Sequence, residues 1–97
     1  MTIQLTDVEL RLIKEVLKST LVGAKFYLFG SRAKGTARPF SDADIVIVSD
    51  HIVPLEVLSA LNERLSESDL VFKVDLVDWQ RISPEFRNKI KNEWVEI

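Results

Sequence analysis

Apolar residues near the start of the chain recur every three or four positions, and this spacing predicts an amphipathic helix. Thr6 and Glu9 stand three residues apart at the start of the pattern, as in a capping box, and predict where the helix begins. Gly23 is a natural left-handed stop and predicts where it ends. The apolar positions of this helix are Val8, Leu12, Ile13, Val16, Leu17 and Leu21.

Three later segments have the patterns of β-strands. Residues 25–29 are rich in aromatic side chains and residues 45–48 form a β-branched run, and both compositions favour strands. If these two strands pair as an antiparallel hairpin, the end of the first lies beside the start of the second. Residues 71–77 alternate as a third strand. Its predicted apolar face is Phe72, Val74 and Leu76.

The remaining segments predict further helices. Residues 31–34 can start a short helix, and Pro54 suits the first turn of a longer one. Ser83 caps another helix at Pro84, and residues 94–97 are predicted to be extended. Together the elements predict an α+β fold, a small sheet with helices packed against it. The positions predicted to be buried in the two longer helices are Val57, Leu58, Leu61, Leu65, Phe86 and Ile90.

Composition limits the classes of protein to which the chain can belong. Its 97 residues suit one domain, 1–97, without separate catalytic and substrate-binding domains. The 13 basic and 15 acidic residues give a net charge of −2, so direct nucleic-acid binding is not expected. Cysteine is absent and His51 is the one histidine, so a metal would need oxygen ligands. With no long apolar run, no membrane contact is expected, and the chain is expected to be cytoplasmic.

The most informative motif joins the first two predicted strands. Gly30 and Ser31 follow the first strand, and Asp42 and Asp44 open the second. A hairpin would place a phosphate-binding turn beside two carboxylates that point to the same face. Mg²⁺ takes such carboxylates together with phosphate oxygens, so the motif predicts a site for a metal-bound nucleotide. Basic residues also gather here, with no acidic residue between Glu15 and Asp42: they are Lys18, Lys25, Arg32, Lys34 and Arg38.

Asp75 is an anomaly in the third predicted strand, because a carboxylate in an apolar strand is costly to bury without a partner. We therefore predict that Asp75 joins Asp42 and Asp44 as a third ligand, in a site where two Mg²⁺ ions meet the phosphates of a nucleotide, as nucleotidyl transfer requires. Each residue also has a purely structural explanation. Asp42 suits a turn, Asp44 a solvent-facing strand position, and Asp75 a strand face beside Lys73.

Residues 29–44 closely resemble the signature of the polymerase β-type nucleotidyltransferase superfamily. Residues 74–78 resemble its third-carboxylate strand and residues 82–90 its closing helix, so the likeness covers nearly the whole chain. The chain looks specifically like a minimal nucleotidyltransferase of the MntA-like antitoxin group. The resemblance implies a small mixed β-sheet and Mg²⁺-dependent transfer of AMP from ATP to a hydroxyl. Residues 92–94 depart from it, since relatives commonly have a glycine there.

The resemblance also implies a partner and a role for each candidate residue. Family members commonly bind a helical HEPN protein, and in toxin-antitoxin versions the acceptor is a tyrosine of that toxin. The expected metal and catalytic residues are Asp42, Asp44 and Asp75, with Asp75 helping to activate the acceptor hydroxyl. The residues expected to cradle the triphosphate are Gly30 and Ser31, with help from Arg32 or Lys34.

Two other functions fit the same residues. One is a non-catalytic subunit that holds nucleotide or caps a helical partner, although the presence of all three carboxylates argues against a decayed site. The other is adenylation of a small molecule such as an aminoglycoside, for which a chain of 97 residues lacks the extra helical domain of those enzymes. Trp79 and Trp94 are expected to pack in a core or interface, not to stack on a base.

Overall fold

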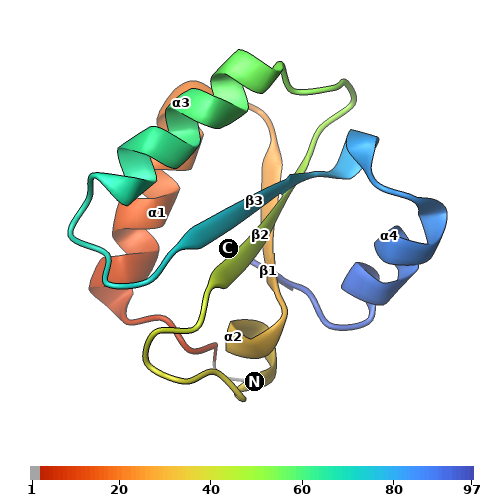
Figure 1. Ribbon diagram of the computed structural model, residues 1–97. Helices are drawn as coiled ribbons and strands as arrows, with labels where there is room; N and C mark the ends of the chain where they lie inside the picture. The colour runs from red at the N-terminus through yellow and green to blue at the C-terminus, as the bar shows by residue number, and fades with distance from the viewer. Residues whose placement is uncertain (1–2) are drawn as a thin grey trace.

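The computed structural model describes residues 3–97 and contains a four-stranded sheet flanked by helices (Figure 1). The strand order is β3-β2-β1-β4. The β1 strand runs antiparallel to both β2 and β4, and β2 runs parallel to β3, so the sheet is mixed, as predicted. The elements are α1 (Asp7–Thr20), β1 (Lys25–Phe29), α2 (Ser31–Lys34), β2 (Ala43–Val48), α3 (Leu55–Ser66), β3 (Val74–Asp78), the 3₁₀ turn η1 (Trp79–Arg81), α4 (Pro84–Lys91) and β4 (Val95–Glu96).

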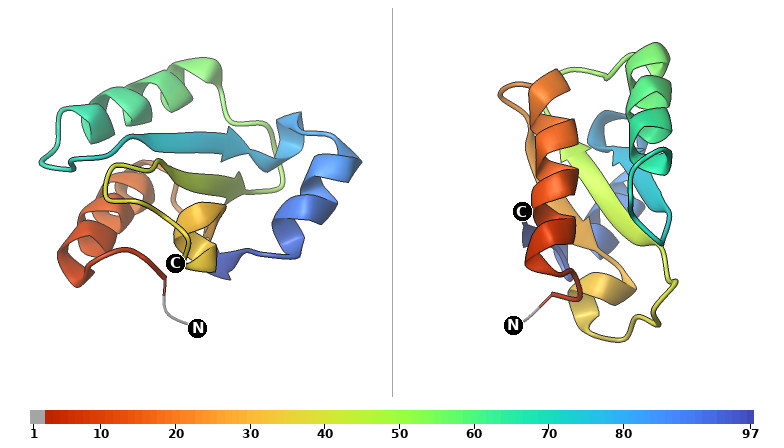
Figure 2. Two further views of the ribbon diagram at one scale, coloured as in Figure 1. Left: turned by 60° about the horizontal axis from the view of Figure 1, so that its bottom comes forward. Right: turned by 90° about the vertical axis from the view of Figure 1, so that its left-hand side faces the viewer.

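One face of the sheet is covered by α1 and α3, which lie side by side in Figure 1 and in the right-hand view of Figure 2. Their apolar stripes meet the inward side chains of the strands, and this larger core accounts for most of the fully buried residues. The helices contribute Ile13, Leu17, Leu61 and Leu65, and the two central strands contribute Phe26, Leu28, Ile45 and Ile47.

The opposite face is covered by α4 and is rich in aromatic side chains. Trp94 stacks on Tyr27 with ring centroids 3.9 Å apart, and Trp79 lies 5.3 Å from Trp94 at a tilt. The Arg87 guanidinium lies 4.9 Å from the Trp79 ring centroid. Both tryptophans therefore pack against the sheet, as the sequence predicts.

The capping box that predicts the start of α1 is present. Thr6 Oγ1 accepts from the backbone of Glu9, and Glu9 Oε1 accepts from the backbone of Thr6. The helix stops at Thr20 with Leu21 as its cap, and Gly23 follows with a φ of 87°.

Among residues 3–97, no helix is both long and apolar enough to cross a membrane.

The third strand is shorter than predicted. We expect residues 71–77 from the alternation, but β3 begins at Val74, and Val71 is exposed. The reason is the length of its neighbour, because β3 is an edge strand that pairs only with β2. The first residue of β2, Ala43, lies opposite Val74. An edge strand extends only as far as its partner does, and the bond of 2.9 Å from Ala43 N–H to Lys73 C=O is the first between the two strands, so the residues before Lys73 have no ladder to join.

Candidate active site

The ends of three strands bring the predicted motif together. Phe29 lies opposite Asp44 in the antiparallel pair, and Asp44 lies opposite Asp75 in the parallel pair. Gly30 follows Phe29 directly and begins the turn into α2, which Figure 1 shows beside the start of β2. The hairpin geometry predicted from the spacing is therefore present, and the register adds Asp75 to the same end of the sheet.

Gly30 lies against the Asp44 side chain, in a backbone conformation that strains any other residue type. Its backbone has φ 74° and ψ −155°, a region that is open essentially only to glycine. A β-carbon at Gly30 would collide with Asp44 Oδ2. The glycine thus allows the turn and the first carboxylate of β2 to occupy adjoining space.

Negative charge accumulates around Asp44, which is half-buried. Burial raises its pKa from 3.8 to about 6, with further contributions from the charges of Asp75, Asp42 and Glu93. Desolvation and like charges both disfavour an ionised carboxylate, and a bound cation would reverse both effects. Among residues 3–97, no three side chains of His, Cys, Asp or Glu lie close enough together to hold a metal ion in this arrangement. The metal assignment of Asp42, Asp44 and Asp75 therefore stays a prediction.

The two cationic candidates for phosphate contact have different surroundings. Arg32 is only 6% exposed and points into the protein, where it donates to the carbonyls of Ser41 (2.9 Å), Gln4 (2.8 Å) and Pro39 (3.0 Å). Its guanidinium also lies 3.9 Å from the centroid of the Phe72 ring. The bonds to Ser41 and Pro39 hold the loop before β2, and the contacts with Gln4 and Phe72 tie it to two other segments, so Arg32 is a structural residue here. Of the predicted alternatives, the geometry favours Lys34.

Lys34 has a half-exposed side chain, and its ammonium lies 3.2 Å from Glu93 Oε2. The other oxygen of the same carboxylate, Oε1, accepts a hydrogen bond of 3.1 Å from the Gly30 backbone N–H. Ser31, which lies between Gly30 and Lys34 in the sequence, is half-buried at the start of α2. Glu93 was not among the predicted site residues, since 63 residues separate it from Gly30.

The loop between α2 and β2 is fastened to the N-terminal segment through Gln4. The Gln4 side chain accepts from Ala37 N–H at 2.7 Å and donates to Ala37 C=O at 3.1 Å. Within the loop, Arg38 N–H donates to Ser41 Oγ at 2.9 Å. These bonds and those of Arg32 position the residues that lead directly into Asp42.

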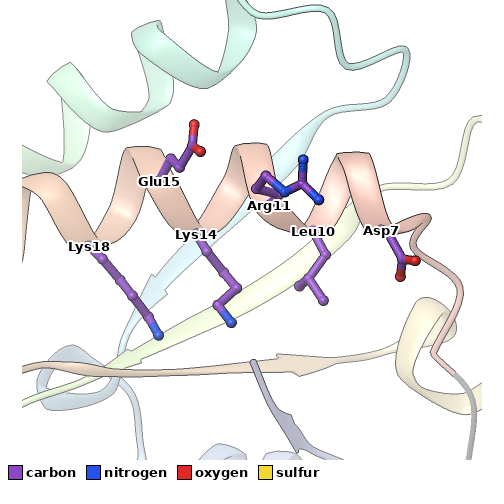
Figure 3. Close-up of a pocket in the computed structure, with 6 residues that line it drawn as sticks. All are labelled: Asp7, Leu10, Arg11, Lys14, Glu15 and Lys18. Carbon is purple, nitrogen blue, oxygen red and sulfur yellow. The ribbon is translucent and has the colours of Figure 1, made fainter.

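Two of the basic residues that cluster in the sequence lie away from the glycine-serine turn, while Arg32 and Lys34 stay beside it in α2. Lys25 starts β1 and lies opposite Val48, at the far end of the hairpin from Gly30. Lys18 lies on α1, where it lines a hollow of about 450 Å³ (Figure 3). The expectation that positive charge concentrates around the glycine-serine turn therefore holds only in part. None of the carboxylates of the candidate site lines this hollow; its lining is Asp7, Leu10, Arg11, Lys14, Glu15 and Lys18.

Asp78 lies at the other end of β3, opposite Ile47, and has structural partners. Its carboxylate accepts from the backbone of Val53 at 2.8 Å and of Gln80 at 3.0 Å, and it lies 3.3 Å from Arg81 Nε. Asp75, by contrast, is exposed and lines a groove of about 610 Å³ between α3 and β3. Of the two carboxylates in β3, Asp78 has a structural role, and the role of Asp75 as a site residue stays a prediction.

Comparison with known proteins agrees with this arrangement. The profile of the nucleotidyltransferase domain family matches residues 10–97. The chain is 38% identical over 89 residues to the probable protein adenylyltransferase MntA of Haemophilus influenzae, covering 92% of this chain and 78% of that protein. It is 31% identical over 101 residues to a spectinomycin 9-adenylyltransferase of Staphylococcus aureus, covering 89% of this chain and 37% of that enzyme.

Solved structures share the fold. A toxin-antitoxin complex with AMP-PNP superposes with a TM-score of 0.78 and 26% identity, covering 89% of this chain and 69% of that one. A complex of tri-AMPylated HEPN toxin with MNT antitoxin from Shewanella oneidensis gives a TM-score of 0.70 at 23% identity, covering 89% of this chain and 66% of that one. The sequence motif, the mixed sheet that gathers it and the profile match all lead to one conclusion: the chain belongs to the nucleotidyltransferase domain family.

Proposed function

We propose that this chain transfers AMP from ATP to a hydroxyl group of a protein partner and releases pyrophosphate. The observation that carries the proposal is the register of three strands, which places the Gly30 turn against Asp44 and Asp44 beside Asp75. A turn that admits phosphate next to a set of carboxylates suits a reaction that separates the α-phosphate of a nucleotide from the other two.

Asp42 and Asp44 would hold Mg²⁺, and the donor set suits this ion because it offers only carboxylate oxygens, which Mg²⁺ takes together with phosphate oxygens. The raised pKa of Asp44 supports this role, because a carboxylate crowded by negative neighbours gains most from a cation. When bound, the ions would neutralise charge on the triphosphate and on the departing pyrophosphate. We propose two ions, with Asp75 contributing on the acceptor side.

Asp75 would orient the acceptor hydroxyl and accept its proton. The acceptor oxygen forms a bond to the α-phosphorus, the bond from that phosphorus to the bridging oxygen of the β-phosphate breaks, and pyrophosphate carries away the bonding electron pair. Gly30, Ser31 and Lys34 would hold the β- and γ-phosphates through a backbone amide, a hydroxyl and an ammonium. Arg32 would contribute indirectly, by holding the loop that positions Asp42.

The acceptor we propose is a tyrosine of a helical HEPN-type toxin, so that the chain acts as an enzymatic antitoxin. Two kinds of relative support this choice: the MntA protein adenylyltransferase and the complex of an AMPylated HEPN toxin with its MNT antitoxin. AMP on a tyrosine replaces a neutral phenol by a bulky anionic diester, which would block a toxin surface by size and charge.

Mass spectrometry of a HEPN-domain protein that binds this chain tests the proposal. After incubation with wild-type chain, ATP and Mg²⁺, we expect the partner to gain AMP units on tyrosine. The Asp42→Ala, Asp44→Ala double variant should add none. If the double variant neutralises the toxin as well as wild type and no mass is gained, the catalytic proposal fails, and a partner-capping subunit takes its place.

A further inference from the structure

Glu93 places a carboxylate on the phosphate-binding turn itself. Its Oε1 accepts from Gly30 N–H at 3.1 Å, and its Oε2 lies 3.2 Å from Lys34 Nζ. A carboxylate that bridges a backbone amide and an ammonium makes the contacts that two phosphate oxygens would make. The side chain is 16% exposed, so it lies within the turn and not on the open surface.

The backbone on both sides of Glu93 is fixed. Glu93 N–H donates to Ile90 C=O at 3.0 Å where α4 ends, and Val95 pairs with Leu28 in the sheet. Between them, the Trp94 ring stacks on Tyr27. The fold therefore delivers this side chain to Gly30, and only rotation of the side chain can withdraw the carboxylate.

The position of Glu93 is also electrostatically unfavourable for a nucleotide. Its charge is one of those that raise the pKa of Asp44, so it adds to the negative potential where a triphosphate would arrive. A phosphate cannot use the Gly30 amide and Lys34 while the carboxylate holds them. The two anions compete for the same pair of donors.

We propose that Glu93 is an internal competitor of the nucleotide, and that a polyphosphate binds only when its carboxylate leaves the Gly30 amide and the Lys34 ammonium. In the nucleotide-free protein the same contact keeps the turn in its binding conformation. This inference rests on the proposed nucleotide site, and it makes Glu93 a determinant of nucleotide affinity. A metal-holding role for Glu93 would have the opposite consequence, because its loss would then weaken binding of ATP with Mg²⁺.

Calorimetric titration of Glu93→Gln and Glu96→Gln separates these roles. The Gln side chain retains a hydrogen-bond acceptor for Gly30 but loses the charge, and Glu96 is an exposed residue of β4 that controls for net charge. Both ATP with Mg²⁺ and metal-free inorganic tripolyphosphate serve as probes. We expect Glu93→Gln to bind each about tenfold more tightly than wild type, the effect of one lost charge-assisted contact. Glu96→Gln should match wild type.

A measurement on the wild-type protein removes any dependence on the variant's folding. The side-chain carboxyl ¹³C resonance of Glu93 should shift when tripolyphosphate is added, while that of Glu96 should stay. If wild type binds the probes but Glu93→Gln binds no more tightly, or the Glu93 resonance does not move, the inference is wrong and the proposed function stands. If wild type binds neither probe, the nucleotide site and this inference fail together.

Discussion

Replacing Gly30 by alanine tests whether the turn and Asp44 share space as described. The backbone at Gly30 has φ 74° and ψ −155°, a conformation that costs a non-glycine residue about 1–3 kcal/mol. The added β-carbon would collide with Asp44 Oδ2, which lies at the end of a side chain that can rotate. We therefore expect a moderate loss of stability, about 2 kcal/mol, and a displaced carboxylate. At about 4–8 °C per kcal/mol, the midpoint of thermal unfolding should fall by about 10 °C.

Gly35→Ala is the matched control. Gly35 caps α2 with φ 81° and ψ 19°, and nothing lies within 4 Å of a β-carbon there. Its replacement should cost about 1 kcal/mol and leave Asp44 in place. Thermal unfolding and calorimetric titration of ATP with Mg²⁺ would be run on both variants, with at least a tenfold loss of affinity expected for Gly30→Ala alone. Equal affinity and equal stability in the two variants would show that Gly30 and Asp44 are not in contact.

Three further predictions concern individual site residues. The folded-state pKa of Asp44 is about 6 against 3.8 ordinarily, so the stability it contributes is fully present below pH 3.8 and is lost as pH rises through 6. In urea unfolding, the free energy of unfolding of Asp44→Asn should therefore exceed that of wild type by roughly 1–2 kcal/mol at pH 7, after allowance for solvent screening. At low pH the two free energies should be equal, and a difference that does not change with pH would contradict this prediction. Asp75→Asn should retain ATP affinity by calorimetry but lose AMP transfer by about a hundredfold or more; near-normal transfer would make Asp75 a strand residue only. Arg32→Met should lose about 3 kcal/mol of unfolding free energy, whereas Lys34→Met should lose under about 1 kcal/mol and bind ATP more weakly than wild type. If Arg32→Met instead weakened ATP binding and Lys34→Met lost more stability, the phosphate role would belong to Arg32.

Local signals in the sequence predict those parts of the fold that depend on neighbouring residues. The capping box at Thr6 and Glu9 predicts the start of α1. The composition of residues 25–29 predicts β1, because the preference of these side chains for a strand does not depend on which strand pairs with it. The start of β3 is set by something else, namely the point at which β2 begins beside it. An alternating pattern contains no information about the length of the partner strand, and so residues 71–73 are predicted wrongly.

The candidate site shows the same division. The spacing of Gly30 and Asp44 predicts their meeting, because a hairpin with a single connection leaves few other arrangements. Residue type alone does not distinguish Arg32 from Lys34, since a side chain's charge does not reveal whether it points into a loop or toward solvent. Glu93 could not be found by spacing, because the pairing of β4 with β1 brings it to Gly30 from the other end of the chain.

The most direct test of a metal-bridged nucleotide site is calorimetric titration of ATP into wild type and Asp44→Asn, each with and without Mg²⁺. In wild type, the triphosphate meets ionised carboxylates unless a cation lies between them, so we expect affinity to rise strongly with Mg²⁺. Asp44→Asn removes both repulsion and a metal ligand, so it should bind ATP more tightly than wild type without Mg²⁺ and more weakly with it. Equal affinities of the two proteins under both conditions would contradict the account, because Asp44 would then face neither metal nor phosphate.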